Sequence, residues 1–279
     1  DGWASGTVKG LIVDAGVLTE GDVGDALSLE TALDNVYDVI NNPKASALNS
    51  SALIDGVIVT GGNANFPDYG PQQTGGGISN TGCSPTIRNC LIIGNRAQHG
   101  AGIDNEDRSH PVIEDCRIRN NLAILVNEDW VLAWGGGINN SHSSNPIIRR
   151  CVISANATQP GGHPSFGAGV HSIWSSRPQI YDCTLSWNVS RRGGGMYGDF
   201  RSVGNCRFIG NSAGGGGGLH LAGNSWSRSI SDCTFEGNSA SSGAGAYTGS
   251  GVSATFVNCQ FRQNNGVGGG ALKVENATA

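Results

Sequence analysis

Seven cysteines recur at one position of a repeated unit, and each is followed five residues later by an asparagine. The gaps between successive cysteines are 26, 35, 32, 23, 27 and 26 residues, so the local motif stays fixed while the connecting lengths vary. A fixed cross-section with insertions at one corner is typical of a solenoid. The cysteines are Cys90, Cys116, Cys151, Cys183, Cys206, Cys233 and Cys259. The asparagines that follow them are Asn95, Asn121, Asn156, Asn188, Asn211, Asn238 and Asn264.

Apolar residues occupy fixed places around each cysteine. One lies three residues before it and another two residues after it, as Ile87 and Ile92 do around Cys90. The step of two has the period of a strand, whereas the step of three breaks that period and requires a corner. The corner residues are mostly Asn or Asp, which suit turns. We therefore predict an all-β parallel β-helix with three short strands per coil.

Each unit also opens with Gly-Gly-Gly or Gly-Ala-Gly followed by an apolar residue. Parallel strands lie about 4.8 Å apart, so we expect equivalent side chains to stack in buried Cys, Ile/Phe and Asn ladders. Residues 1–50 do not follow the repeat and are predicted to form irregular N-terminal coils or a cap, and residues 51–279 form the repeats. The units start near residues 75, 100, 135, 167, 193, 216, 243 and 268.

The repeat resembles that of the chlamydial polymorphic outer-membrane proteins and related secreted bacterial β-helix proteins. Those proteins carry a Gly-Gly-apolar motif and a Phe-x-x-Asn motif in each coil. Here the motifs are Gly-Gly-Gly-Leu219 and Phe208-Ile-Gly-Asn211, and Ile or Leu replaces Phe in earlier coils. The match covers roughly residues 52–279. The resemblance implies a right-handed parallel β-helix that is secreted or on the cell surface, and it brings no catalytic residues with it.

Composition excludes some classes of function. The formal net charge is −5 and no basic stripe supports nucleic-acid binding. No apolar run is long enough to span a membrane. The first residue is Asp1, which suggests a processed product. We expect the ladder cysteines to be free, buried thiols, and Cys83, which lies off the ladder, to be the reactive one.

The last unit begins at Gly268 and contains only its first strand before Ala279. Such an end exposes apolar ladder ends and unpaired backbone groups. A trimmed chain or a further downstream segment would explain it. Alternatively, the open end stacks on the first coil of another copy, and this head-to-tail contact would generate a filament.

Three insertions enter at the corner between the Asn position and the next glycine triplet, at residues 63–74, 122–134 and 157–166. Insertions on stacked coils gather on one side, which is often the binding side. Their aromatic rings could stack on sugar rings beside carboxylates that bind hydroxyls. Alternatively, Trp130 and Trp134 cover the apolar stretch of their own loop. The candidate ligand-binding residues are Phe66, Tyr69, Glu128, Asp129, Trp130, Trp134, His163 and Phe166.

A second polar cluster contains Asp104, Glu106 and Asp107. Carboxylates on stacked coils can hold Ca²⁺, and with an arginine they would resemble the site of pectate-lyase-like β-helix enzymes. A solvated loop is the alternative, because paired acids do not recur at equivalent positions, as polysaccharide hydrolysis would need. No other cofactor is predicted. Four histidines are interpreted as scattered surface or turn residues: His99, His142, His171 and His220.

The sequence therefore favours a non-enzymatic extracellular protein, secreted or at the cell surface, that serves as a structural subunit or an adhesin. Its expected partners are a glycan or another cell-surface ligand, and further copies of itself. Two alternatives stay open: a polysaccharide-active lyase or hydrolase, and a carbohydrate-binding module without turnover.

Overall fold

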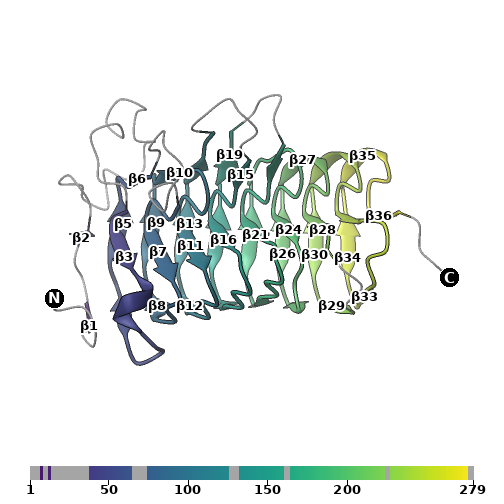
Figure 1. Ribbon diagram of the computed structural model, residues 1–279. Coiled ribbons are helices and arrows are strands. Elements are labelled where there is room, and N and C mark those ends of the chain that lie inside the picture. Colours follow the sequence, from purple (N-terminus) through teal and green to yellow (C-terminus); the bar gives the residue numbers. More distant parts are fainter. Residues whose placement is uncertain are drawn as a thin grey trace.

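A computed structural model describes residues 7–8, 12–13, 38–64, 74–125, 132–159, 164–223 and 227–275. The chain winds into a rod of stacked coils, with the N-terminal strands at one end and the C-terminal strands at the other (Figure 1). Strands of successive coils pair in parallel, so that equivalent residues such as Ile87 and Ile113 face each other. The predicted parallel β-helix is confirmed.

Three sheets of nine strands form the sides of the rod. Sheet A contains β1 (Thr7–Val8), β4 (Leu53–Asp55), β8 (Thr86–Arg88), β12 (Val112–Glu114), β17 (Ile147–Arg149), β22 (Gln179–Tyr181), β25 (Ser202–Gly204), β29 (Arg228–Ser231) and β33 (Ala254–Val257). Sheet B contains β2 (Ile12–Val13), β5 (Ile58–Thr60), β9 (Leu91–Ile93), β13 (Arg117–Arg119), β18 (Val152–Ser154), β23 (Thr184–Ser186), β26 (Arg207–Ile209), β30 (Thr234–Glu236) and β34 (Gln260–Arg262). Sheet C contains β3 (Ile40–Asn42), β7 (Ile78–Thr81), β11 (Ile103–Glu106), β16 (Ile138–Asn140), β21 (Val170–Ser172), β24 (Met196–Gly198), β28 (Leu219–Leu221), β32 (Ala246–Thr248) and β36 (Leu272–Val274).

Short strands between sheets B and C form a fourth file that the sequence did not predict. It arises because the chain keeps pairing with the neighbouring coil after each ladder asparagine, as when Leu122 N donates to Asn95 O at 3.0 Å. The strands are β6 (Asn63–Ala64), β10 (Arg96–Ala97), β14 (Leu122–Ala123), β15 (Ala133–Trp134), β19 (Ala157–Thr158), β20 (Ser165–Phe166), β27 (Ser212–Gly215), β31 (Ser239–Ser242) and β35 (Asn265–Gly268). A 3-10 turn, η2 (Lys44–Ser46), follows β3.

The interior consists of the predicted apolar and thiol ladders. The inward-facing Ile side chains of sheets A and B are buried, as are Phe208 and Phe235, whereas Phe256 and Phe261 in the last coil are half-buried. Phe208, Phe235 and Phe261 stack with ring centroids 4.6 and 4.7 Å apart. All eight cysteines are free thiols. Each ladder thiol donates to a carbonyl of the preceding coil, as Cys116 does to Ile87 O at 3.6 Å.

The predicted asparagine ladder satisfies every polar atom of its buried amides. Asn121 Nδ2 donates to Ile92 O at 3.1 Å and to Asn156 Oδ1 at 3.0 Å. Its Oδ1 accepts from both the backbone N and the Nδ2 of Asn95, each at 3.0 Å. These bonds offset the cost of removing the amide from water.

The same pattern continues to the C-terminal end of the ladder. Asn188 Nδ2 donates to Asn211 Oδ1 at 3.0 Å, and Asn238 Nδ2 donates to Asn264 Oδ1 at 2.9 Å. Asn188 and Asn238 are completely buried, as predicted. The prediction of burial is wrong for the last rung, because Asn264 and Cys259 are only half-buried. Asn264 still donates to Phe235 O at 2.9 Å, but no described coil stacks a further asparagine on it.

Two backbone requirements explain the fixed corner residues. The residue before each ladder cysteine has φ between 50° and 56°, a left-handed conformation that Asn and Asp tolerate best. The third glycine of a triplet allows close approach of two coils, because a Cβ on Gly137 would lie 2.6 Å from the carbonyl oxygen of Gly169.

The described part of the predicted N-terminal segment pairs with the repeats. β1 extends sheet A, β2 extends sheet B and β3 begins sheet C.

The expectation that Cys83 is reactive is wrong. Its side chain is completely buried against Leu48 and Ala52, and its Sγ donates to Pro43 O at 3.2 Å. The turn of η2 covers the thiol, and a reactive cysteine needs access to solvent.

Removing one asparagine from the ladder should leave buried polar groups of both neighbouring coils without hydrogen-bond partners. We expect Asn156→Ala to lower the free energy of unfolding by about 2–4 kcal/mol. Asn265→Ala is the matched control, because Asn265 is an exposed residue of β35. Urea unfolding followed by circular dichroism measures both variants, and equal midpoints would contradict the proposed role of the ladder.

Thiol access gives a second check on the fold. In the native protein, we expect Cys259 to react slowly with a thiol reagent, because it is the one half-buried cysteine. All eight should react after denaturation. Rapid native reaction of several thiols would mean that the sulfurs do not line the interior.

Candidate functional site

The outer face of sheet C carries a file of polar and aromatic side chains. Each strand contributes the residue directly after the apolar position that follows the glycine triplet, and strand register places these residues one above another. The file reads Ser79, Asp104, Asn139, His171, Tyr197, His220, Tyr247 and Lys273. Its N-terminal part is therefore polar and its C-terminal part is aromatic.

Six rings stack along this face to form what we call the aromatic ladder. Successive ring centroids lie 4.3–5.6 Å apart, within the range of favourable aromatic contacts. Since neighbours cover most ring faces, the ladder mainly presents ring edges. Its members are His99, Trp134, His171, Tyr197, His220 and Tyr247.

The ladder histidines are neutral at pH 7. Burial lowers the pKa of His99 and of His220 to about 4, and that of His171 to about 3. His171 is held by Asn139, whose Oδ1 lies 2.7 Å from the ring Nδ1. Because Asn139 Nδ2 donates to Asp104 Oδ1 at 2.7 Å, the amide orientation assigns the imidazole proton to Nδ1.

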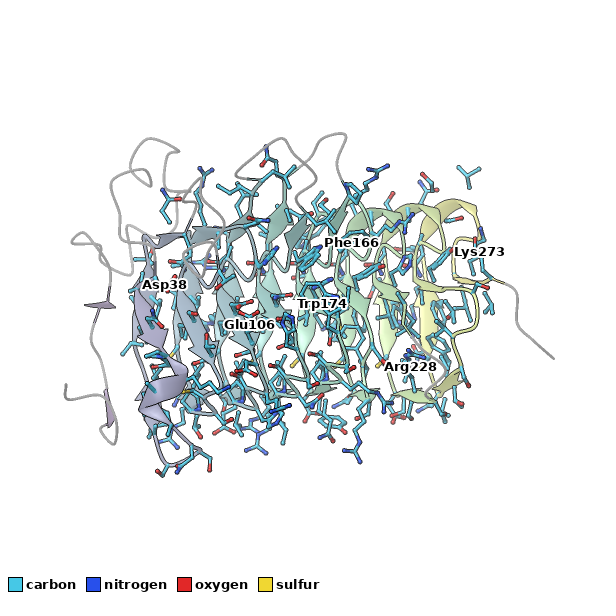
Figure 2. All side chains as sticks on the ribbon, viewed as in Figure 1. Asp38, Glu106, Phe166, Trp174, Arg228 and Lys273 are labelled. Carbon is cyan, nitrogen blue, oxygen red and sulfur yellow. The ribbon has the colours of Figure 1, made fainter. Side chains whose placement is uncertain are left out.

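A groove runs beside the ladder over the C-terminal half of the rod. It consists of two adjoining hollows of about 550 and 390 Å³, which share Tyr197, Ala222 and Gly223. Trp174 lines the smaller hollow and Lys273 the larger one. Figure 2 shows Trp174 near the middle of the rod and Lys273 near its C-terminal end.

Trp174 is the most exposed aromatic residue of the described groove lining, at 47 %. It lies in a tight turn after β21 and has φ of 52°, which is unusual for a bulky residue. Its ring packs edge-on against Trp134 at 4.9 Å and lies 4.6 Å from His142. The turn therefore places the solvent-exposed indole of Trp174 at one end of the groove.

A buried ion cluster lies beneath the smaller hollow. Arg228 has a completely buried side chain and donates from Nε to Asp199 Oδ1 at 2.9 Å. Arg177 Nε lies 3.5 Å from the same oxygen. Burial raises the pKa of Asp199, while the two guanidinium groups oppose that shift and favour its charged form.

Polar groups of the larger hollow are also paired. The Glu275 carboxylate lies 3.3 Å from Lys273 Nζ and, together with burial, raises the pKa of Tyr247. Burial raises the pKa of Tyr247 to about 12, so its hydroxyl stays protonated. Burial raises the pKa of Tyr197, and the positive charge of Arg192 opposes that shift.

Sequence comparison agrees with this architecture. A family model described as the right handed beta helix region matches residues 34–190 and 133–279. The chain belongs to the right-handed β-helix family. No curated protein and no solved structure matches it.

This β-helix brings two of the predicted ligand-binding residues together. Trp134 and Phe166 are register partners in β15 and β20, next to the ladder. Trp134 is only 6 % exposed and lies between His99 and His171, so it supports the groove and offers no free ring face. The remaining candidates lie outside the described residues: Phe66, Tyr69, Glu128, Asp129, Trp130 and His163.

The three calcium candidates take different partners. The buried Asp104 accepts a hydrogen bond from Asn139 Nδ2. Glu106 Oε1 lies 3.0 Å from His142 Nδ1, and Asp107 Oδ2 lies 2.6 Å from Lys44 Nζ. Burial raises the pKa of Asp104 well above its usual range, which disfavours the ionised form that binds calcium. Over the described residues, no group of three or more His, Cys, Asp or Glu side chains is placed to hold a metal.

The interpretation of the histidines as scattered residues is wrong for three of them. His99, His171 and His220 stack in one ladder, and His171 and His220 are buried. The signal was present in the sequence, because His171, Tyr197, His220 and Tyr247 occupy the same place after successive triplets. In the described part of the β-helix, no helix is sufficiently long and apolar to span a membrane.

The buried histidines predict a pH dependence of stability. Between pH 4 and 6.5, the histidine binds a proton in the unfolded chain but stays neutral in the folded protein. Because the unfolded state binds more protons, the free energy of unfolding increases as pH rises through this window. We expect His99→Phe to reduce the slope of unfolding free energy by up to about 1.4 kcal/mol per pH unit there. Urea unfolding at several pH values measures it. Above pH 7 the two profiles should be parallel, and an unchanged slope below pH 6.5 would contradict the burial of a neutral imidazole.

Proposed function

We propose that this β-helix is a non-enzymatic glycan-binding protein that acts outside the cell as an adhesin or surface protein. The groove along sheet C is the observation that carries this proposal. It is an open hollow on a rigid face, with an exposed indole at one end and hydroxyl, imidazole and charged groups along its length. Such a lining suits a chain of sugars, which has both apolar ring faces and many hydroxyls.

The dimensions of the groove favour an extended ligand. Its lining extends from Trp174, after β21, to Lys273 in β36. Four steps between stacked strands separate these elements in sheet C, which corresponds to about 20 Å along the rod. A polymer lying parallel to the rod axis would contact several coils at once.

The charges in the groove favour binding over hydrolysis. Two carboxylates belong to its described lining, Asp199 and Glu275, and both are engaged with cationic side chains. A glycosidase needs one protonated and one free carboxyl group on either side of the scissile bond.

The neutral His220 donates through Nδ1 to Gly215 O at 3.2 Å, which orients the ring.

The extracellular setting rests on resemblance. The Gly-Gly-apolar and Phe-x-x-Asn motifs resemble those of secreted and outer-membrane β-helix proteins, and the right-handed β-helix fold serves both adhesins and polysaccharide-active enzymes. Head-to-tail self-association stays a prediction.

A polysaccharide panel tests the proposal. We expect the purified protein to bind at least one polysaccharide, and Trp174→Ala to weaken that binding about tenfold, the equivalent of about 1.4 kcal/mol. Trp187→Ala is a matched control, because Trp187 is 64 % exposed, also has positive φ, and follows β23 of sheet B, away from the groove.

The same panel detects turnover. Released reducing ends or unsaturated products would replace the non-enzymatic proposal with a lyase or hydrolase. Equal loss of binding in both tryptophan variants would remove the groove from the proposal.

A further inference from the structure

The cysteine ladder is a file of identical thiols that the proposed glycan-binding function does not use. Each ladder Sγ lies 3.5–3.8 Å from a carbonyl oxygen of the preceding coil and 3.0–3.4 Å from the carbonyl oxygen two residues before it. Because all seven side chains share one orientation, neighbouring sulfurs are separated by the spacing of parallel strands, about 4.8 Å. The ladder therefore contains seven sulfurs in a row, with six gaps between them.

The gaps are too wide for disulfide bonds but suit a bridging cation. A disulfide brings two Cβ atoms to about 3.8 Å, which strands in register do not allow without distortion. Two metal–sulfur bonds of about 2.3 Å, placed in line, span about 4.6 Å. A cation between two neighbouring sulfurs would therefore fit the ladder with the strands in their present register.

The surroundings of the ladder select cations that need only two ligands. Six of the seven ladder cysteines are at most 2 % exposed, and Ile and Phe side chains pack around them. Zinc takes four ligands in structural sites and an iron–sulfur cluster needs four cysteines, so neither fits a single file of thiols. Cu(I) is a soft cation that binds thiolates and is stable with two ligands in line. Each such cation has two ligands, so the absence of groups of three or more among the described residues does not bear on it.

We propose that the cysteine ladder binds a row of soft monovalent cations of the Cu(I) type, one between each pair of neighbouring sulfurs. Filling all six gaps replaces seven S–H bonds with twelve metal–sulfur bonds, releases seven protons and leaves one net negative charge. No electron is transferred, because the cation enters and stays in one oxidation state. The ladder lies inside the rod, so this inference is independent of the groove along sheet C.

The charge balance makes the uptake cooperative. The first cation requires two buried thiolates and leaves one uncompensated negative charge, which is costly in an apolar interior. Each further cation requires only one more thiolate, so it adds no net charge. Partly filled ladders are therefore less stable than a mixture of empty and full ones.

Loss of the thiol protons leaves the nearby backbone carbonyl groups with partners. Cys116 Sγ donates to Glu114 O at 3.2 Å, but the same oxygen also accepts from Asn89 N at 3.2 Å. The equivalent oxygen of the next coil, Arg149 O, accepts from Asp115 N at 3.2 Å. The backbone pairing of the coils therefore persists when a cation replaces the thiol hydrogens.

The test is refolding of the full chain with Cu(I). The protein is unfolded in urea and refolded without oxygen in the presence of a Cu(I)–acetonitrile complex, because the buried thiols are accessible only in the unfolded chain. After gel filtration, we expect about six copper ions per chain and two sulfur neighbours per copper by X-ray absorption. With too little copper, native mass spectrometry should show a mixture of empty and filled chains. Zn(II) is the comparison cation and should bind at one ion per chain or fewer.

A valine substitution tests the position of the cations. Val57 takes the cysteine position in the preceding coil and is buried, so valine fits this place in the fold. Cys183→Val divides the ladder into two groups of three sulfurs and should reduce uptake from about six to about four copper ions. Cys83→Ser is the matched control, because Cys83 lies off the ladder and Ser109 takes its place in the next coil. This control should keep the wild-type uptake.

Several results would overturn the inference. These are uptake near zero in the wild-type protein, equal uptake by the wild type and Cys183→Val, and a third sulfur neighbour at copper. If Cys183→Val does not refold, Cys90→Val makes the same test at the end of the ladder, where about five copper ions are expected. Unchanged uptake in that variant would equally contradict the inference. Glycan binding is tested separately by the polysaccharide panel.

Discussion

Hydrogen bonding between identical side chains of adjacent coils is the constraint on which the rest of this β-helix depends. A ladder asparagine such as Asn121 bonds a carbonyl of the preceding coil and the amides of both neighbours. A shift of one residue in any coil would leave these buried groups without partners and reverse the strand faces. Register is therefore fixed coil by coil, independently of the length of the connecting loops.

A fixed register makes the outer face of sheet C easy to vary. The interior requires Cys, Ile or Phe and Asn at set positions. The residue after each apolar position of sheet C instead packs against its equivalents in the adjacent coils and against the neighbouring short strands. Aromatic residues at consecutive outer positions then stack without any further adjustment of the backbone. The groove is a direct product of that stacking, because its lining includes Tyr197, His220 and Tyr247.

Features that recur in every coil could be predicted from the sequence, whereas contacts that occur in only a few coils could not. The thiol, apolar and asparagine ladders were predictable because each coil contains the same residue at the same place. The ladder of Asn42, Asn80, Asn105 and Asn140 was missed, since residues without an amide side chain take its place in every later coil. These residues are Ser172, Gly198, Leu221, Thr248 and Val274. The aromatic ladder was missed because His, Tyr and Trp alternate, and because Trp134 enters from a different strand. The pairing of Asp199 with Arg228 joins separate coils through irregular turns, which no spacing rule anticipates.

The outer file of sheet C changes character along the rod, from Ser79, Asp104 and Asn139 to His171, Tyr197 and Tyr247. If every coil carried the same residue in this file, a bound polymer could shift by one coil spacing without losing binding free energy, because all positions would be equivalent. Here a shift toward the N-terminal end would move the polymer from aromatic side chains onto hydroxyl, carboxyl and amide groups. For the proposed glycan ligand, this change in side chains would set one preferred position and one direction of binding along the rod.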